Sequence, residues 1–306
     1  MKKQLFLLPA VCLAFFLFPA SLSLAQTLPS LLVSGDAAAT GLAGAAVAAP
    51  ANAFVLENNP AAMALSPDQG AGGASFGLWQ PGAAADKVLS AGGYLRLGSK
   101  LAVGLTGKIF NQPSYDVTSA NGVVSQIGGA FTPQEMSFGA GLAYALTDHL
   151  SLGVTGRMVS SSLAEEAKAS AISLDAGLLY SQDALRAGLT VAHLGGKVTY
   201  EEDGYAQPTV VKAGGAYEII PGLTGNLEAD YFLGGGFNAK IGAAWQVAEI
   251  ATLRAGYNAG ASNAYLPSFA SLGAGLHLSG LRIDLSWLTA NKNLGNSLCI
   301  GASYAF

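Results

Sequence analysis

Charge, cysteine and histidine are all scarce in this sequence, and each scarcity excludes a class of protein. Charged residues make up 11% of the 306 residues, against roughly 25% in an average soluble domain. The formal net charge of −4 gives no basic surface, so we expect no nucleic-acid partner. Two cysteines and three histidines are too few for a disulfide framework or a Cys/His metal cluster. We therefore expect no metal, no cofactor and no enzymatic activity.

Long hydrophobic runs are also missing, although 51% of the residues are hydrophobic and 40 are glycine. The most apolar stretch after the first residues, 41–56, is interrupted by Pro50 and Asn52, whereas a transmembrane helix needs about 20 mostly apolar residues. An apolar content this high also excludes a disordered chain. A closed β-barrel is the other structure that can span a membrane.

The first 25 residues have the pattern of an export signal. Lys2 and Lys3 precede an apolar stretch, 5–18, and Ser23-Leu24-Ala25 is a small-x-small cleavage site. We expect cleavage after Ala25, which leaves Cys299 as the one cysteine of the mature chain and permits no internal disulfide. The alternative, a membrane anchor, is disfavoured because the apolar stretch is too short.

From residue 70 onward, apolar and polar residues alternate in segments of about ten residues, as in transmembrane β-strands. The predicted strands are 70–79, 87–97, 100–110, 134–146, 150–162, 170–182, 184–195, 208–219, 223–233, 237–247, 250–258, 268–278, 280–289 and 296–306. Every second connection is short and the others are mostly longer, which is the pattern of an outer-membrane barrel. The alternative, a soluble β-sandwich, does not require this alternation of connection lengths. The sequence thus predicts an all-β protein, a fourteen-stranded antiparallel transmembrane β-barrel over residues 70–306.

Charged residues in these segments fall mainly on the polar face, which would line the barrel interior. A lysine or arginine facing lipid at mid-bilayer costs about 2–4 kcal/mol, so this segregation has a physical cause. We predict a network of lumen charges in which Asp175 pairs with Arg186 and four further residues pair across neighbouring strands. These four residues are Lys212, Glu228, Asp230 and Lys240.

The sequence ends on an alternating strand with Tyr304 and Phe306 on its apolar face. Outer-membrane barrels commonly finish on such an aromatic residue. We therefore predict that Tyr304 and Phe306 form the signal read by the barrel-assembly machinery, and that lipids of the outer membrane of a Gram-negative bacterium surround the barrel.

Residues 26–69 do not alternate and are rich in small residues. A Gly-x-x-Gly-Ala-x-Val-Ala stretch that contains Gly41 and Gly44 is followed by Asn59-Pro60-Ala61 directly before the first predicted strand. This arrangement resembles the start of FadL-like barrels, in particular the PorV/PorQ family of outer-membrane proteins, although Ala62 stands where that family often has glycine.

The resemblance implies that residues 26–69 form a hatch folded inside the barrel. Its motif would consist of Gly41, Gly44, Asn59, Pro60 and Ala61. Pro60 restricts Asn59 to extended conformations, and the Asn59 amide can then hydrogen-bond to the wall. The alternative is that Asn59-Pro60-Ala61 is a plain turn into the first strand.

Three functions remain open at the level of sequence. The resemblance implies an association with type IX protein secretion or surface attachment, with partners such as secreted proteins that carry a C-terminal sorting domain or other secretion components. The alternative is a FadL-like channel for long-chain fatty acids or other hydrophobic compounds. A purely structural barrel is the third.

Overall fold

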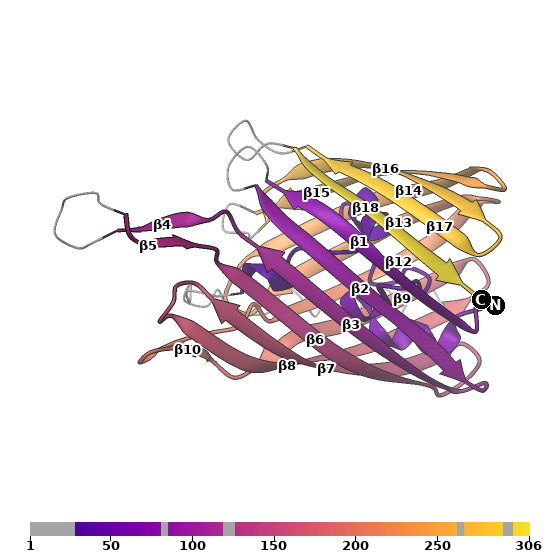
Figure 1. Cartoon of the computed structure of the whole chain (residues 1–306). Coiled ribbons are helices and arrows are strands. Elements are labelled where there is room, and N and C mark those ends of the chain that lie inside the picture. Colours follow the sequence, from indigo (N-terminus) through magenta and orange to yellow (C-terminus); the bar gives the residue numbers. More distant parts are fainter. Residues whose placement is uncertain (1–27, 81–84, 119–125, 262–265, 290–295) are drawn as a thin grey trace.

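The computed structural model describes residues 28–80, 85–118, 126–261, 266–289 and 296–306. The predicted signal peptide lies outside these residues. In the described part of the chain, fourteen antiparallel strands form one closed barrel, in which β1 pairs with both β2 and β18 (Figure 1). The fold class predicted from the sequence is confirmed.

The barrel strands agree with the predicted segments to within about two residues at most ends. In chain order they are β1 (Gly70–Trp79), β2 (Asp86–Leu97), β3 (Leu101–Asn111), β6 (Gln134–Ala145), β7 (Leu150–Ser162), β8 (Lys168–Gln182), β9 (Leu185–Gly195), β12 (Val210–Ile220), β13 (Leu223–Phe232), β14 (Phe237–Ala248), β15 (Ala251–Gly260), β16 (Phe269–Leu278), β17 (Leu281–Leu288) and β18 (Ser297–Ala305).

The barrel strands have an apolar outer face and a mostly small or polar inner face, with a few buried apolar side chains such as Phe110 and Phe232. In β7, Leu152, Val154 and Met158 are exposed on the outside, whereas Thr155 and Arg157 are buried inside. This alternation satisfies both environments, since the outer side chains can contact lipid and the inner ones can hydrogen-bond.

The two ends of the barrel differ, and we call them the short-turn end and the long-connection end. The long-connection end carries two hairpins, β4 (Tyr115–Thr118) with β5 (Gln126–Phe131) and β10 (Val198–Tyr200) with β11 (Asp203–Tyr205). The sequence predicted only plain connections at these two places. The β4–β5 hairpin extends well beyond the barrel wall (Figure 1).

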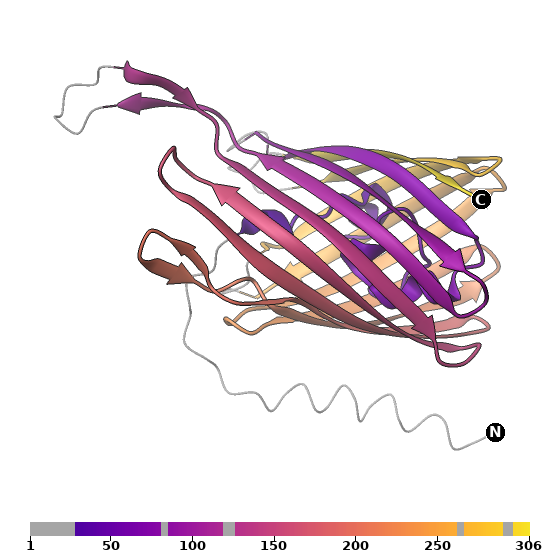
Figure 2. The same ribbon diagram turned by 60° about the horizontal axis from the view of Figure 1, so that its bottom comes forward.

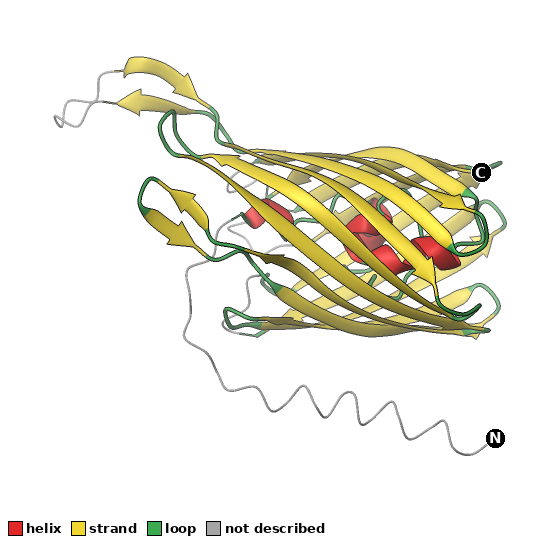
Figure 3. Ribbon diagram, turned by 90° about the horizontal axis from the view of Figure 1, so that it is seen from below, coloured by secondary structure: helices red, strands yellow, loops and turns green. Residues whose placement is uncertain are grey.

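Residues 28–66, which we call the inner segment, lie inside the barrel. Its short helices are η2 (Pro29–Leu31), α2 (Ala37–Gly41), α3 (Val55–Asn58) and η3 (Pro60–Leu65). The two views turned about the horizontal axis show these helices enclosed by strands (Figures 2 and 3). In the described part of the chain, no helix has the length and apolar character needed to cross a membrane.

Glycines in the wall make room for the inner segment. Leu56 packs against Gly104 and Gly141, where a Cβ would overlap its side chain. Val47 approaches Gly188 of β9 and Gly214 of β12 in the same way. These close approaches explain why inward positions of the strands are so often glycine, because any side chain there would displace the inner segment.

Candidate site: the contacts between the inner segment and the barrel wall

Asn59, Pro60 and Ala61 lie at the junction of α3 and η3. Asn59 is extended, with φ −155° and ψ 106°, and caps η3, because its Oδ1 accepts a hydrogen bond from the Ala61 N–H at 3.1 Å. Its Nδ2 donates to the carbonyl of Val47 at 2.8 Å and to the carbonyl of Leu178 in β8 at 3.0 Å. One buried amide thus joins two parts of the inner segment to the wall.

Two of the wall residues that contact this motif are glycines, Gly153 and Gly177. A Cβ at Gly177 would overlap the Asn59 side chain, and a Cβ at Gly153 would overlap the Pro60–Ala61 backbone. Ser151 also donates from its Oγ to the Ala61 carbonyl at 2.8 Å. All three motif residues therefore contact the barrel wall.

Gly41 and Gly44 lie at and just after the end of α2, on the opposite side of the barrel. Ser271 of β16 donates from its Oγ to the Gly41 carbonyl at 3.0 Å and accepts from the Ala43 N–H at 2.8 Å. A Cβ at Gly41 would lie 3.1 Å from the Gly273 Cα. Gly44 has a φ of +81°, a left-handed conformation that favours glycine.

Glu228, Asp230 and Lys240 form a buried ion cluster directly beside Gly44. The Lys240 Nζ lies 2.9 Å from the Glu228 Oε1 and 2.6 Å from the Asp230 Oδ2. The Glu228 Oε2 accepts hydrogen bonds from the N–H groups of Ala46 and Val47 at 2.8 and 2.7 Å. Three of the four predicted residues therefore pair with one another, whereas no ion pair of Lys212 is found among the described residues. Glu228 also holds the backbone of the inner segment.

The predicted pair between Asp175 and Arg186 is wrong. Asp175 is instead paired with Arg157 of the preceding strand, whose Nη2 lies 2.7 Å from the Asp175 Oδ2 and which also donates to the Leu56 carbonyl. Arg186 lies opposite Ser181, six residues from Asp175 in β8, which at about 3.3 Å per residue places it roughly 20 Å away. Their positions on consecutive strands were not sufficient to bring the two side chains together.

A β-bulge in β9 also changes the surroundings of Asp175. The pairing of β8 with β9 shifts between Leu174 and Ala176, and His193 has a positive φ of 61°. The Asp175 Oδ1 accepts a hydrogen bond from the His193 N–H at 2.9 Å. The bulge thereby directs the backbone of β9 toward Asp175, which strand alternation does not predict.

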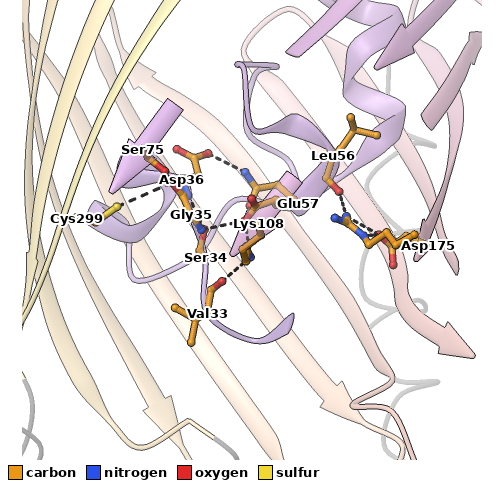
Figure 4. A network of polar contacts seen from close by, with 12 residues as sticks. Val33, Ser34, Gly35, Asp36, Leu56, Glu57, Ser75, Lys108, Asp175 and Cys299 are labelled. Carbon is orange, nitrogen blue, oxygen red and sulfur yellow. Dashed lines mark hydrogen bonds and ion pairs between the residues drawn. The ribbon is translucent and has the colours of Figure 1, made fainter. Parts of the chain in front are cut away.

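Two acidic residues of the inner segment were missed by sequence reasoning. Glu57 lies 2.9 Å from the Lys108 Nζ and accepts the Gly35 N–H, and Lys108 also donates to the Val33 carbonyl at 2.6 Å (Figure 4). Although burial favours the neutral acid, Lys108 and the Gly35 N–H hold the pKa of Glu57 below its ordinary value. The only signal in the sequence was that Glu57 and Asp36 are polar residues within an apolar stretch.

Asp36 organises the same region from the start of α2. Its Oδ1 caps the helix by accepting from the Ala38 and Ala39 N–H groups, and its Oδ2 accepts from the side-chain amides of Asn52 and Asn58, both at 2.8 Å. Burial raises the pKa of Asp36, an effect that these hydrogen bonds oppose. Asp36 thus joins the start of α2 to α3 and the residues before it.

Tyr304 and Phe306 lie at the short-turn end, where the last strand meets the first. The backbone N–H and carbonyl of Phe306 form two hydrogen bonds with Gly70, both 3.0 Å long. The two aromatic rings stack with their centroids 6.4 Å apart and stay exposed on the outside of the barrel. These residues close the barrel, and their recognition during assembly remains a prediction.

No group of three or more metal-ligating side chains is present among the described residues. Together, the closed fourteen-stranded wall, the lipid-compatible outer face and the buried inner segment define a transmembrane β-barrel that encloses a segment of its own chain. Residues 21–230 match the family model described as "Type IX secretion system protein PorV". This match covers more than half of the chain, which therefore belongs to the PorV family.

Two solved structures share this fold. The Pseudomonas putida toluene transporter TodX matches with a TM-score of 0.62 and 13% identity, over 94% of this chain and 99% of that one. A Pseudomonas aeruginosa FadL homologue matches with a TM-score of 0.59 and 14% identity, over the same shares of the two chains. At this identity the likeness concerns the fold alone. None of the curated proteins matches the sequence.

The family and the fold together place the chain in the Gram-negative outer membrane and associate it with type IX protein secretion or surface attachment. Of the predicted site residues, the structure brings Asn59, Pro60 and Ala61 against β7 and β8, and Gly41 and Gly44 against β14 and β16. Lys212 lines the interior near Lys240, and Arg186 lies apart from both clusters.

Proposed function

We propose that this protein is a closed, non-catalytic barrel of the type IX secretion apparatus, and that the inner segment acts as a hatch that prevents free passage of solutes. The observation that carries this proposal is the anchoring of the inner segment to opposite sides of the wall. Asn59 bonds to β8, while Ser271 of β16, six strands away around the barrel, bonds to Gly41 and Ala43. A segment fixed on both sides blocks the interior unless several buried polar groups are broken from their partners, each at a cost of about 1–3 kcal/mol.

Contacts with other secretion components would then take place at the long-connection end. The β4–β5 hairpin extends outward there (Figure 1), and its Tyr115 is 42% exposed while the ring packs 5.7 Å from that of Phe131. We propose that this end receives secreted proteins with a C-terminal sorting domain, which is the partner class that the family resemblance implies. A plugged barrel fits a receiving role better than a conducting one.

Site-specific photo-crosslinking in the host tests the receiving role. A photoreactive amino acid replaces Tyr115 at the long-connection end, and a second variant carries it at Asp183, an exposed turn residue at the short-turn end. We expect crosslinks to proteins with a C-terminal sorting domain at position 115 and not at position 183. No such crosslink at 115, or equal amounts at both positions, would contradict the proposal.

Uptake of hydrophobic compounds is the second candidate. The fold is shared with a toluene transporter, and apolar residues line part of an interior cavity, including Leu31, Trp79 and Leu288. The cavity volume of about 80 Å³ and the pairing of every wall strand with both of its neighbours favour the closed barrel instead. Proteoliposomes that accumulate toluene or oleate faster than empty liposomes would establish this second function.

A further inference from the structure

A row of polar side chains crosses the outer face of the barrel near its long-connection end. Five residues on the neighbouring strands β2, β3, β6, β7 and β8 lie directly opposite one another in the strand register. We call them the polar row, and in order they are Lys87, Asn111, Gln134, Ser162 and Lys168. Neighbouring strands are about 4.8 Å apart, so the row is roughly 19 Å long.

The polar row faces away from the lumen, because successive side chains of a strand point to opposite faces. The residues next to its first four members are buried on the inner face, and these are Val88, Phe110, Glu135 and Ser161. Lys87 and Lys168 are exposed, and the three residues between them are partly exposed. Leu89, two residues from Lys87 on the same face, is 49% exposed and belongs to the lipid-facing surface. The row therefore continues that surface from the acyl chains to the headgroups of the outer leaflet.

The row rises along the barrel axis from Lys87 to Lys168, because the strands of a barrel are tilted by about 35–45°. At this tilt each strand raises the row by about 3 Å, so Lys168 lies roughly 12 Å further from the membrane centre than Lys87. Two views show the β7–β8 hairpin extending further outward than the start of β2 (Figures 1 and 2). A headgroup with phosphate near the acyl chains and sugars above it matches this arrangement.

The charge of the row is positive at its Lys87 end. Neither lysine of the row forms an ion pair with any residue that the structure describes. Asp86, the acid next to Lys87 in the sequence, is buried on the inner face. Glu165 and Glu166 precede Lys168 in the β7–β8 turn, so the opposite end of the row is closer to neutral. An anionic group is therefore best placed at Lys87.

Hydrogen-bonding groups fill the row between the two lysines. The Gln134 Nε2 donates to the Asn111 Oδ1 at 2.6 Å, which fixes the two amides side by side. The NH₂ group of Asn111 has no partner among the described residues, and Ser162 adds a hydroxyl. These groups can donate to and accept from sugar hydroxyls.

The barrel wall is apolar at the long-connection end of the sector across the barrel. There β13 and β14 are joined by three glycines, 234–236, and the flanking Leu233 and Phe237 are 46% and 41% exposed. That sector suits acyl chains, whereas the polar row suits a headgroup. The contrast assigns the row to one side of the molecule.

We propose that the polar row binds the phosphorylated sugar headgroup of one lipopolysaccharide molecule in the outer leaflet. Lys87 pairs with a phosphate, since lysine is a good phosphate ligand, and the amides of Asn111 and Gln134 hydrogen-bond to sugar hydroxyls. A phospholipid has one phosphate and no sugar, so it would use Lys87 and leave the rest of the row without a partner. This inference goes beyond the proposed role in secretion and holds whether or not the long-connection end receives a secreted protein.

Native mass spectrometry of the purified, detergent-solubilised protein tests the proposal with lipid A, the phosphorylated disaccharide lipid at the base of lipopolysaccharide. We expect one lipid A per barrel to bind at least about tenfold more tightly than phosphatidylglycerol, because only lipid A offers sugar groups to the amides. Equal binding of the two lipids would overturn the sugar contacts. Absence of any retained lipid A would overturn the proposal altogether.

A matched pair of variants identifies the phosphate ligand. Lys87→Met should weaken lipid A binding at least about tenfold, whereas Lys100→Met, at the short turn that follows β2, should leave it unchanged. Both lysines are exposed, so neither change should prevent folding. Equal binding by the two variants would contradict the role of Lys87.

Photo-crosslinking in the host distinguishes a lipid from a protein at the row. A photoreactive amino acid at Gln134 should give a product that an antibody against lipid A detects. The same amino acid at Trp245, which is exposed on the outer face near the short-turn end, should give none. A crosslink from position 134 to a protein in place of lipopolysaccharide would make the row a protein interface and would overturn the proposal.

Discussion

The Nδ2 atom of Asn59 lies 3.0 Å from the carbonyl oxygen of Leu178, which is 119 residues further along the chain. This bond joins the inner segment to a strand of the wall, and the same amide also donates to the Val47 carbonyl. An asparagine is well suited to this position because its amide group donates to both carbonyls while its oxygen caps the following helix.

Asn59→Asp should destabilise the protein while preserving the shape of the side chain. The aspartate still accepts from the Ala61 N–H, but it offers no hydrogen to the carbonyls of Val47 and Leu178. We expect the free energy of unfolding to fall by about 1–3 kcal/mol. On a gel, the band should then shift from the folded to the unfolded position after heating at a lower temperature than for the parent protein. The matched control is Asn111→Asp, because Asn111 acts as an acceptor for Gln134 and an aspartate can do the same. Equal effects of the two changes would contradict the anchoring role of Asn59.

The buried pair of Arg157 and Asp175 should appear in a double-mutant cycle. Removing one partner leaves the other buried and uncompensated, which costs about 3–5 kcal/mol. We therefore expect the Arg157→Ala and Asp175→Ala changes to be non-additive by about 0.5–3 kcal/mol when unfolding is followed by loss of β-sheet circular dichroism. Arg186→Ala combined with Asp175→Ala serves as the control, and its effects should add. Additivity at 157 and 175 would show that this pair does not interact.

The barrel could be predicted from the sequence because its strands obey a simple two-residue period over long stretches. Alternation identified every strand of the wall, and the restriction that Pro60 places on Asn59 predicted the extended conformation that is observed. These are local properties, each determined by neighbouring residues.

The pairing of interior charges could not be predicted in the same way. Alternation shows which face a side chain occupies, but not how far along a neighbouring strand its partner lies. Asp175 forms its ion pair with Arg157 of the preceding strand, β7, and the bulge at His193 alters the pairing of β8 with β9. Glu57 and Asp36 are placed by the path of an irregular segment that has no period, so their contacts with Lys108 and Asn52 depend on the complete tertiary structure.

Glu228→Gln should loosen the inner segment at Ala46 and Val47. The glutamine loses the ion pair with Lys240 and directs its NH₂ group toward either that cation or the backbone N–H groups. We expect amide hydrogen exchange in residues 42–48 to accelerate about tenfold, as measured by mass spectrometry. Glu202→Gln, at an exposed residue near the long-connection end, is the control and should change nothing. Unchanged exchange in the Glu228 variant would mean that other contacts hold this stretch.

Deleting Phe306 should impair closure of the barrel. The deletion removes two hydrogen bonds to Gly70 and one ring of the stacked pair with Tyr304, a loss of about 1–3 kcal/mol if each hydrogen bond contributes about 0.5–1.5 kcal/mol. We expect less folded protein in outer-membrane fractions, judged by the difference in gel mobility between boiled and unboiled samples. Phe306→Tyr keeps the ring and the backbone bonds and should assemble normally. Normal assembly of the deletion variant would show that the terminal residue is neither needed for closure nor read during assembly.

The reaction rate of a cysteine placed at Ala45 tests most directly whether the inner segment closes the barrel. Ala45 is 3% exposed, so in a Cys299→Ala background this cysteine should react with a membrane-impermeant maleimide at least about a hundredfold more slowly than one placed at the exposed Lys197, because reaction requires local opening. Asn59→Asp, added to the Ala45→Cys variant, should accelerate the reaction. Labelling at 45 as fast as at 197 in the parent protein would place this residue in contact with open solvent and would contradict a closed barrel.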